Sequence, residues 1–390
     1  MDNLLIALAS ASLAAWGMLL LFRHGFWRAD QRLDDEPTEP ARWPGVVALV
    51  PARNEETSVA HCLGALAEQD YPGRFSVILI NDGSTDKTAE AARQAAGKTI
   101  EHEHHIKVID APPLETGWAG KLWALQHGID HVASSSYAAD YFWFTDADIV
   151  NEPDTLRRLV AKAETEDLAM VSLMVRLACT SLWERLLVPA FIFFFQMLYP
   201  FRAINDPSQS VAGAAGGCVL VHGRALEHAG GLAALKDRLI DDCALGALIK
   251  ARGNGIWLGL AERSLSLRRY TKLSEFWQMV ARSAFVQLKH STWLLAGSVM
   301  AMVVTFLGAP LIVLTTPLHG DLAAAAIGAV SFALMSLAYL PTVRYHRMAG
   351  TNALLLAPAA ALYILMTLDS ARRHWTGHGA TWKDRAYQPK

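Results

Sequence analysis

One stretch decides the fold: Tyr141-Phe142-Trp143-Phe144-Thr145-Asp146-Ala147-Asp148. Its four bulky residues predict a strand that is buried on both faces, as strands of parallel sheets are. Asp146 and Asp148 follow at once, and open α/β sheets bind ligands where their strands end. Two carboxylates at such an edge suit Mg²⁺ or Mn²⁺ bridging the phosphates of a substrate. A solvated acidic turn is the plain alternative for a lone Asp-x-Asp, so the interpretation depends on the rest of the chain.

A first strand-and-loop unit lies well upstream of this stretch. Val46–Val50 predicts a buried strand, and the loop Pro51–Glu56 follows it. Asn54 is the expected cap of the next helix, with two acids in its first turn. The apolar residues that follow recur with a helical period.

A second unit repeats the pattern. Val77–Ile80 predicts another strand, and it runs into the polar loop Asn81–Thr88, which contains Asp82. Alternation of strand, loop and helix predicts a parallel sheet with right-handed crossovers. The acidic loops would then lie at one edge of the sheet, although a turn or capping role is the alternative for Asp82.

Three later segments add groups of the kinds that bind and transform a phosphorylated substrate. Lys121 opens a predicted helix that runs towards the Asp146 strand, where its ammonium could meet a phosphate. The glycine-rich run 213–217 lets the backbone approach a ligand, but it lacks the Lys-Ser/Thr of a P-loop. Asp241 and Asp242 open a helix whose dipole favours the ionised form that a general base needs. A solvated lysine and a plain helix cap remain the alternatives.

The composition narrows the class of protein. The chain has 390 residues, of which 52% are hydrophobic and 18% charged, against about 25% charged in ordinary soluble domains. A net charge of −2 gives no reason to expect a nucleic-acid partner. Four widely spaced cysteines predict neither disulfides nor a zinc site. The histidine-rich segment 101–105 is better explained as a solvated loop than as a metal site.

Long apolar runs predict a membrane protein. Leu4–Phe22 is long enough to span a bilayer, and it lacks the basic leader and cleavage site of a signal peptide, the alternative interpretation. Basic residues follow it and place the next segment in the cytoplasm. Three more spans are predicted at Trp293–Pro317, Leu322–Leu340 and Ala353–Leu368.

Two shorter apolar segments suit the membrane surface better than its interior. Leu186–Phe201 is short for a span and contains Pro189, which favours a re-entrant or interfacial segment over a buried core helix. Leu273–Leu288 is amphipathic and predicts an interfacial helix, with an ordinary domain helix as the alternative.

The charges near the C-terminus conflict with three C-terminal spans. Starting from a cytoplasmic domain, three spans leave the tail outside, yet the tail is basic and basic segments prefer the inside. Arg344 and Arg347 prefer the inside as well. Either one apolar run is re-entrant or one basic cluster breaks the rule, and the sequence leaves both open.

These features predict an ordered set of segments. They are an N-terminal transmembrane anchor (1–24), a linker (25–44), a catalytic domain (45–270) with an apolar interfacial segment (186–201), an amphipathic interface helix (271–290), C-terminal transmembrane segments (291–370) and a basic tail (371–390).

The middle of the chain resembles the inverting glycosyltransferases of family 2, which have the nucleotide-sugar-binding GT-A fold. Four motifs appear in the family's order, and together they are far more specific than any one: Pro51–Glu55, Asn81–Asp86, Asp146–Asp148 and Ile240–Asp242. Nearly the whole chain, including Trp183–Phe191 and Leu198–Phe201, is similar to the bacterial hopanoid-associated membrane glycosyltransferases. Asn81 and Asp241 stand where the family usually has Asp and Glu.

The resemblance implies a GT-A catalytic domain with one N-terminal and about three C-terminal membrane helices, in a bacterial cytoplasmic membrane with the domain facing the cytoplasm. It implies Asp242 as catalytic base and Mg²⁺ or Mn²⁺ on Asp148 and Asp146. Donor binding would involve Pro51, Arg53, Glu55, Asp82, Lys121 and Asp146, with Gly216, Gly217, Asp241 and Arg282 as acceptor-binding or supporting residues.

The implied activity is transfer of a sugar from a nucleotide-diphosphate donor, of the UDP type, to a hopanoid-related lipid. A polyprenyl-phosphate or ceramide-type lipid glycosyltransferase shares every catalytic motif and is the alternative. A non-catalytic membrane scaffold is the remaining one. The Gln-x-x-Arg-Trp motif of processive synthases is absent; Gln278–Arg282 is only similar to it. The sugar, nucleotide, metal and oligomeric state are left open.

Overall fold

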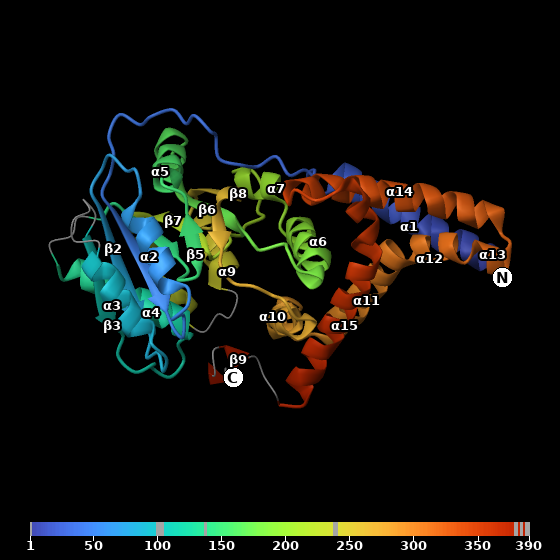
Figure 1. Cartoon of the computed structure of the whole chain (residues 1–390). Helices are drawn as coiled ribbons and strands as arrows, with labels where there is room; N and C mark the ends of the chain where they lie inside the picture. The colour runs from blue at the N-terminus through green and yellow to red at the C-terminus, as the bar shows by residue number, and fades with distance from the viewer. Residues whose placement is uncertain are drawn as a thin grey trace. The chain divides into compact units, whose positions relative to one another are not determined.

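The chain divides into two units in its computed structural model, which describes residues 2–98, 105–135, 139–236, 241–377, 381–382 and 385–386 (Figure 1). The sheet unit comprises Asp30–Ala178 and Ala203–Arg269. The helical unit comprises Met1–Ala29, Cys179–Arg202 and Tyr270–Lys390.

The sheet unit is built on eight strands in the order β3-β2-β1-β4-β7-β6-β8-β5. The strands are β1 (Val46–Ala52), β2 (Phe75–Asn81), β3 (His105–Asp110), β4 (Tyr141–Thr145), β5 (Ile149–Asn151), β6 (Leu168–Arg176), β7 (Cys218–His222) and β8 (Gly255–Ser266). The helices are α2 (Val59–Ala67), α3 (Thr88–Lys98), α4 (Gly120–Ala133), α5 (Thr155–Thr165), α7 (Phe201–Asn205), α8 (Gly223–His228), η1 (Leu232–Leu235) and α9 (Asp241–Lys250).

The predicted α/β fold is confirmed, because β1 pairs in parallel with both β2 and β4. The sheet becomes mixed beyond β4, where β7 runs antiparallel to β4 and to β6. Every residue of β4 is buried, as four consecutive bulky side chains require.

Helices cover both faces of this sheet. Val46, Ala48 and Val50 of β1 belong to the same buried cluster as apolar residues of α2 and α5. Leu49, which alternates with them, lies against Gly128 of α4 on the opposite face. Burial on both sides explains why β1 has apolar residues at successive positions rather than at every second one.

The expected helix cap at Asn54 is wrong. α2 begins only at Val59, after Ser58, and Asn54 has a backbone φ of 51°. Its side-chain oxygen instead accepts a hydrogen bond of 2.9 Å from the backbone N–H of Thr85. Asn54 therefore joins the loops after β1 and β2, a long-range role that local capping rules cannot predict.

The helical unit contains α1 (Asp2–Phe22), α6 (Leu182–Leu198), α10 (Leu273–Gln287), α11 (Thr292–Met302), the π-helical turn η2 (Val303–Gly308), α12 (Ala309–Leu314), α13 (Thr316–His319), α14 (Leu322–Tyr345), the 3₁₀ segment η3 (Gly350–Leu355), α15 (Leu356–Trp375), and the paired residues β9 (Thr381–Trp382) and β10 (Arg385–Ala386). Among the described residues, four stretches are long and apolar enough to cross a membrane: Asn3–Phe22, Thr292–Leu314, Leu322–Tyr345 and Gly350–Trp375.

α6 packs against several other helices of the helical unit. Phe193 packs against Trp16 of α1 and Tyr339 of α14, with ring centroids 6.5 and 5.2 Å apart. Phe194 packs against Phe306 of η2 and Tyr363 of α15. Aromatic residues on neighbouring positions of α6 therefore join helices from both ends of the chain.

Candidate active site

The two acids after β4 lie at the edge where the sheet strands end. Asp146 follows β4 directly, and its backbone N–H donates to Gly217 O at 3.3 Å, just before β7. Asp148 precedes β5 and is the less exposed acid, with 13% side-chain exposure against 38% for Asp146. Both carboxylates face cations of the chain.

Lys121 pairs with the first of these acids. It lies in the first turn of α4, as predicted, and its Nζ is 2.6 Å from Asp146 Oδ1. The same ammonium donates to Gly216 O at 3.0 Å. Lys121 thus links the loop after β4 to the glycine segment before β7, a juxtaposition of residues almost a hundred positions apart.

Asp242 lies on the other side of that glycine segment. Its Oδ2 accepts a hydrogen bond of 2.9 Å from the Gly216 N–H, and its Oδ1 accepts one of 2.7 Å from the Cys243 N–H. A Cβ on Gly216 would lie 3.2 Å from both Asp242 Cβ and Lys121 Nζ, so this approach requires glycine. A carboxylate, an ammonium and a backbone amide therefore meet at one point.

Burial raises the pKa of the Asp242 carboxyl, although part of the residue remains exposed to solvent. The two N–H donors and the positive charge of Lys121 act in the opposite direction, and Asp146 adds to the rise. A carboxylate with a raised pKa is a stronger base, while its donors and Lys121 keep the ionised form accessible.

Arg268 contributes a second cation, which sequence reasoning missed. β5 pairs with the end of β8, and Leu267 N donates to Asp148 O at 2.7 Å. This pairing leaves Arg268 with Nε 3.8 Å from Asp148 Oδ2 and Nη2 3.7 Å from Glu55 Oε1. The available signal in the sequence was the adjacent pair Arg268 and Arg269 at the end of the predicted catalytic domain.

The loops after β1 and β2 form a connected group. Arg53 Nη1 donates to the carbonyls of Asp82 and Gly83 at 2.7 and 2.9 Å, and Glu55 N–H is bound to Thr88 Oγ1 at 2.7 Å. Asp82 is buried, with 2% exposure. Arg53 is therefore placed to hold the Asp82 loop in position.

Asn81, which stands where the family usually has an acid, has a defined partner. Its Nδ2 donates to Asp110 Oδ1 at 2.7 Å, and Arg93 binds the other oxygen of Asp110 at 2.8 Å. An Asp at position 81 would place two carboxylates against each other. The amide is thus matched to Asp110 at the end of β3.

Cys62 shows that three of the predicted acids share one neighbourhood. The pKa of its thiol is raised first by burial and then by the charges of Asp148, Asp146 and Glu55. Its Sγ also lies 3.6 Å from Asp146 O. Cys62 is consequently a neutral thiol beneath the acidic loop.

Several predicted residues lie elsewhere or outside the described residues. Pro51 is part of β1 and Gly217 directly precedes β7. Arg282 lies on α10 in the helical unit, so it is not among the residues that the sheet unit gathers. The side chain of Asp241 is not described, and most of the 101–105 segment also lies outside the described residues.

The donor set suits a metal that a substrate helps to bind. No three His, Cys, Asp or Glu side chains that could hold a metal ion gather within the described residues. Asp146 and Asp148 offer hard oxygen ligands whose charges are already matched by cations. Mg²⁺ is commonly held by one or two carboxylates plus substrate phosphates, so the two residues fit such an ion.

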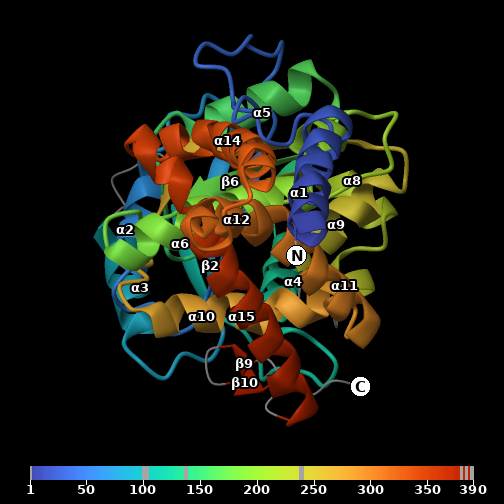
Figure 2. The same ribbon diagram turned by 90° about the vertical axis from the view of Figure 1, so that its right-hand side faces the viewer.

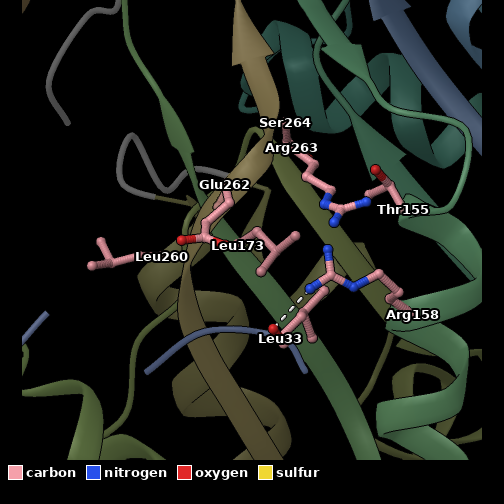
Figure 3. A pocket seen from close by; sticks show the side chains of 9 residues that line it. Leu33, Thr155, Arg158, Leu173, Leu260, Glu262, Arg263 and Ser264 are labelled. Carbon is pink, nitrogen blue, oxygen red and sulfur yellow. Dashed lines mark hydrogen bonds between the residues drawn. The ribbon is translucent and has the colours of Figure 1, made fainter. Parts of the chain in front are cut away.

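A small pocket in the sheet unit is separate from these residues (Figure 3). It lies between the N-terminal part of α5, β6 and β8, and Arg158 Nη2 in it donates to Leu33 O at 2.8 Å. The predicted site residues that the structure describes do not line it. The candidate site therefore does not coincide with this pocket.

Comparison with solved structures identifies the fold of the chain. The mannosyltransferase PcManGT from Pyrobaculum calidifontis, in complex with GDP-Man and Mn²⁺, has a similar structure with a TM-score of 0.58 at 21% sequence identity. The likeness covers 93% of this chain and 99% of that one. The fold is therefore the GT-A fold, as predicted.

Sequence comparison gives a partial match. Residues 47–230, a little under half of the chain, match the model described as glycosyl transferase family 2. The 4,4'-diaponeurosporenoate glycosyltransferase of Staphylococcus aureus (strain USA300) is 37% identical over 101 residues, which make up 26% of this chain and 23% of that protein. The enzyme of strain NCTC 8325 / PS 47 matches equally. The chain thus matches about a quarter of these relatives' length.

Proposed function

We propose that this chain is a membrane-bound, inverting, metal-dependent glycosyltransferase that moves a sugar from a nucleotide-diphosphate donor of the UDP type to a hopanoid-related lipid. One set of contacts carries the proposal. Asp242 accepts a hydrogen bond from Gly216, and Lys121 contacts both Gly216 and Asp146. This arrangement joins a base, a phosphate-binding cation and the Asp-x-Asp motif in a family 2 domain.

Asp242 is the base in this proposal. It accepts the proton of the acceptor hydroxyl as that oxygen attacks the anomeric carbon and the nucleotide diphosphate leaves from the opposite face. A single displacement inverts the configuration, and no covalent enzyme intermediate is needed. The N–H groups of Gly216 and Cys243 fix the carboxylate so that one orientation meets the hydroxyl.

The donor is held by the loops after the strands. Glu55 and Asp82 contact the ribose and base, while Pro51 and Arg53 shape the loop that carries them. Lys121 binds the diphosphate. Mg²⁺ or Mn²⁺ on Asp148 and Asp146 would neutralise the charge of the leaving diphosphate.

The acceptor in this proposal is a lipid, because the described part of the same chain carries four candidate membrane helices. The Staphylococcus aureus relative is named for a carotenoid acid, which supports an isoprenoid-derived acceptor over a ceramide. A polyprenyl phosphate is also built from isoprene units, so the acceptor assay must distinguish it from a hopanoid. In this proposal the domain faces the cytoplasm of a bacterial inner membrane.

The test is transfer of labelled sugar by membranes that contain the full chain. The membranes are incubated with UDP-sugars or GDP-sugars, Mn²⁺, and either purified hopanoids or polyprenyl phosphate. Asp242→Asn should lower transfer by about 10²–10⁴-fold, the usual contribution of a general base. The matched control is Asp130→Asn, which removes a carboxylate from an exposed turn of α4.

Label in the hopanoid fraction that Asp242→Asn lacks and Asp130→Asn retains supports the proposal. Label only in polyprenyl phosphate keeps the glycosyltransferase and replaces the acceptor. Equal transfer by Asp242→Asn and the parent chain contradicts the assigned base. No transfer from any donor by folded protein favours the scaffold.

A further inference from the structure

Polar and apolar contacts show how the membrane helices run. Ala9 of α1 lies in one cluster with Ala324 of α14, and Ser12 Oγ is 2.9 Å from Ser331 Oγ. Moving along α1 towards its C-terminal end, the contacts therefore also move towards the C-terminal end of α14. The two helices run side by side in the same direction (Figure 1).

The stretch from α11 to α12 runs the opposite way. Ile312 of α12 joins the cluster around Ala9, whereas Thr305 O accepts a hydrogen bond of 2.9 Å from Trp16 Nε1. The C-terminal end of this stretch therefore packs near the N-terminal end of α1, so the two run antiparallel. The end of α1, the end of α14 and the start of α11 consequently lie at one face of the bundle.

We call this end the basic face, because Arg23, Arg28, Arg344 and Arg347 follow or end α1 and α14 there. It is also where the chain leaves α1 for the sheet unit at Asp30. By the preference of Lys and Arg for the cytoplasmic side, the basic face is cytoplasmic.

The beginning of α15 lies at the basic face. A Cβ on Gly350 of η3 would be 3.3 Å from Leu340, near the end of α14. Met348 Sδ lies 3.5 Å from Cys179 Sγ, and Cys179 directly follows the last residue of a sheet-unit segment.

The end of α15 lies at the same face. Trp277 Nε1 of α10 donates to Asp369 Oδ2 at 2.8 Å, and Phe285 N donates to Ser370 Oγ at 3.0 Å. The His374 ring stacks on His290, between α10 and α11, at 4.2 Å. α15 therefore begins and ends beside segments of the cytoplasmic side.

Figures 1 and 2 agree with these contacts, because α15 lies beside α10 and runs across the group of α1, α12 and α14 rather than along it. Its exposed large side chains recur at helical spacing on one side: Leu365, Leu368 and Trp375. A helix with one apolar face and cationic residues at its end suits the membrane surface.

We propose that α15 does not cross the membrane but lies in the lipid headgroup layer, with the C-terminal tail on the same side of the membrane as the basic face. By length and composition alone, α15 also qualifies as a membrane span. The packing of the helices instead leaves three crossings, which are made by α1, by the stretch from α11 to α12, and by α14. This removes the conflict in the charge pattern, since Arg372 and Arg373 then share the side of the other basic clusters.

Cysteine labelling of the full chain in intact cells tests this assignment. Single substitutions Leu318→Cys, Thr351→Cys and Lys390→Cys are exposed to a membrane-impermeant maleimide before and after permeabilisation. The parent chain, whose own cysteines are buried or half-buried, gives the background. Leu318 lies in α13, just before the start of α14, and is 86% exposed. Thr351 lies just after the other end of α14.

The comparison depends on which positions share a side, not on the absolute orientation. Labelling of Lys390→Cys together with Thr351→Cys, and opposite to Leu318→Cys, supports the proposal. Labelling of Lys390→Cys together with Leu318→Cys overturns it, because α15 then crosses. Labelling of all three on one side overturns it as well, since α14 then does not span. Sugar transfer is not part of this readout, so the two proposals fail independently.

Discussion

Lys121 Nζ lies 2.6 Å from Asp146 Oδ1 and 3.0 Å from Gly216 O, so one ammonium joins the acidic loop to the segment that holds Asp242. The side chain of Lys121 is 21% exposed, and that of Asp146 is 38% exposed. This partial exposure leaves the pair accessible to a diphosphate. The Lys121 ammonium could therefore pair with a phosphate group of the donor in place of the Asp146 carboxylate, without a change in the position of Lys121.

Replacing Lys121 by Met should weaken donor binding. The change removes the cation that would pair with the diphosphate, so the KM for the nucleotide sugar should rise more than kcat falls. The measurement is initial transfer rate against donor concentration. Lys107→Met, on the exposed edge strand β3, removes the same charge away from the site and should leave both constants unchanged.

The same substitution should also move the pH profile. In the proposed mechanism Asp242 must be ionised to accept a proton, so transfer should fall as pH drops through its pKa, which burial raises. The Lys121 charge opposes that rise. Removing it should shift the acid limb of kcat/KM to higher pH, and a shift to lower pH would contradict the assignment.

Replacing Arg268 by Gln should change binding of the metal. Arg268 lies 3.8 Å from Asp148, so a divalent cation competes with its guanidinium for that carboxylate. Since exposed ion pairs contribute about 0–1 kcal/mol, binding of Mn²⁺ without donor should tighten by up to about fivefold. Titration of Mn²⁺ by electron paramagnetic resonance measures this, with Arg269→Gln as the control of equal charge. Weaker binding in Arg268→Gln would sink the idea of competition.

Adjacent glycines should respond differently to alanine. A Cβ at position 216 meets Asp242 and Lys121 at 3.2 Å, whereas one at position 217 meets Val175 Cγ2 at 3.0 Å. Gly216→Ala should therefore lower transfer by roughly 10²-fold, as small displacements of reacting groups do, with little change in stability. Gly217→Ala should mainly cost stability, by about 1–3 kcal/mol of overpacking. Thermal unfolding and transfer assays on both variants would show whether the two effects separate.

Lys250 should be required to hold the segment that leads to Gly216. Its Nζ donates to the carbonyls of Ala203, Ile204, Asp206 and Val211 at 3.4, 2.7, 3.0 and 2.8 Å. Lys250→Met leaves these carbonyl groups without that donor. Each carbonyl that stays without a hydrogen bond should lower the free energy of unfolding by about 1–3 kcal/mol. The melting temperature should fall well below that of the parent chain and of Lys107→Met. An unchanged melting temperature would show that water replaces the ammonium.

Local sequence patterns accounted for most of the elements and for the acids at their ends. Four bulky residues before Asp146 predict β4 because burial on both faces demands apolar side chains at every position. Lys121 was correctly placed at the start of α4. Asn54 shows the limit, because its partner Thr85 belongs to another loop and no local rule connects them.

The site itself depends on contacts between distant segments. Lys121, Gly216 and Asp242 come from three separate loops, and only the packing of α4, β7 and α9 brings them within hydrogen-bonding distance. Arg268 reaches Asp148 because β5 pairs with β8. Strand register is set by long-range packing, so sequence reasoning did not place this arginine in the site.

By itself, the sequence determined the alternating strands and helices, the acidic loops and the apolar runs, because each follows from periodicity and side-chain polarity over a few residues. Only the tertiary structure decided which loops meet, which cation faces which acid, and that both ends of α15 lie at the basic face. Hydropathy measures how well a helix dissolves in lipid, but its direction through the membrane is fixed by the neighbours against which it packs.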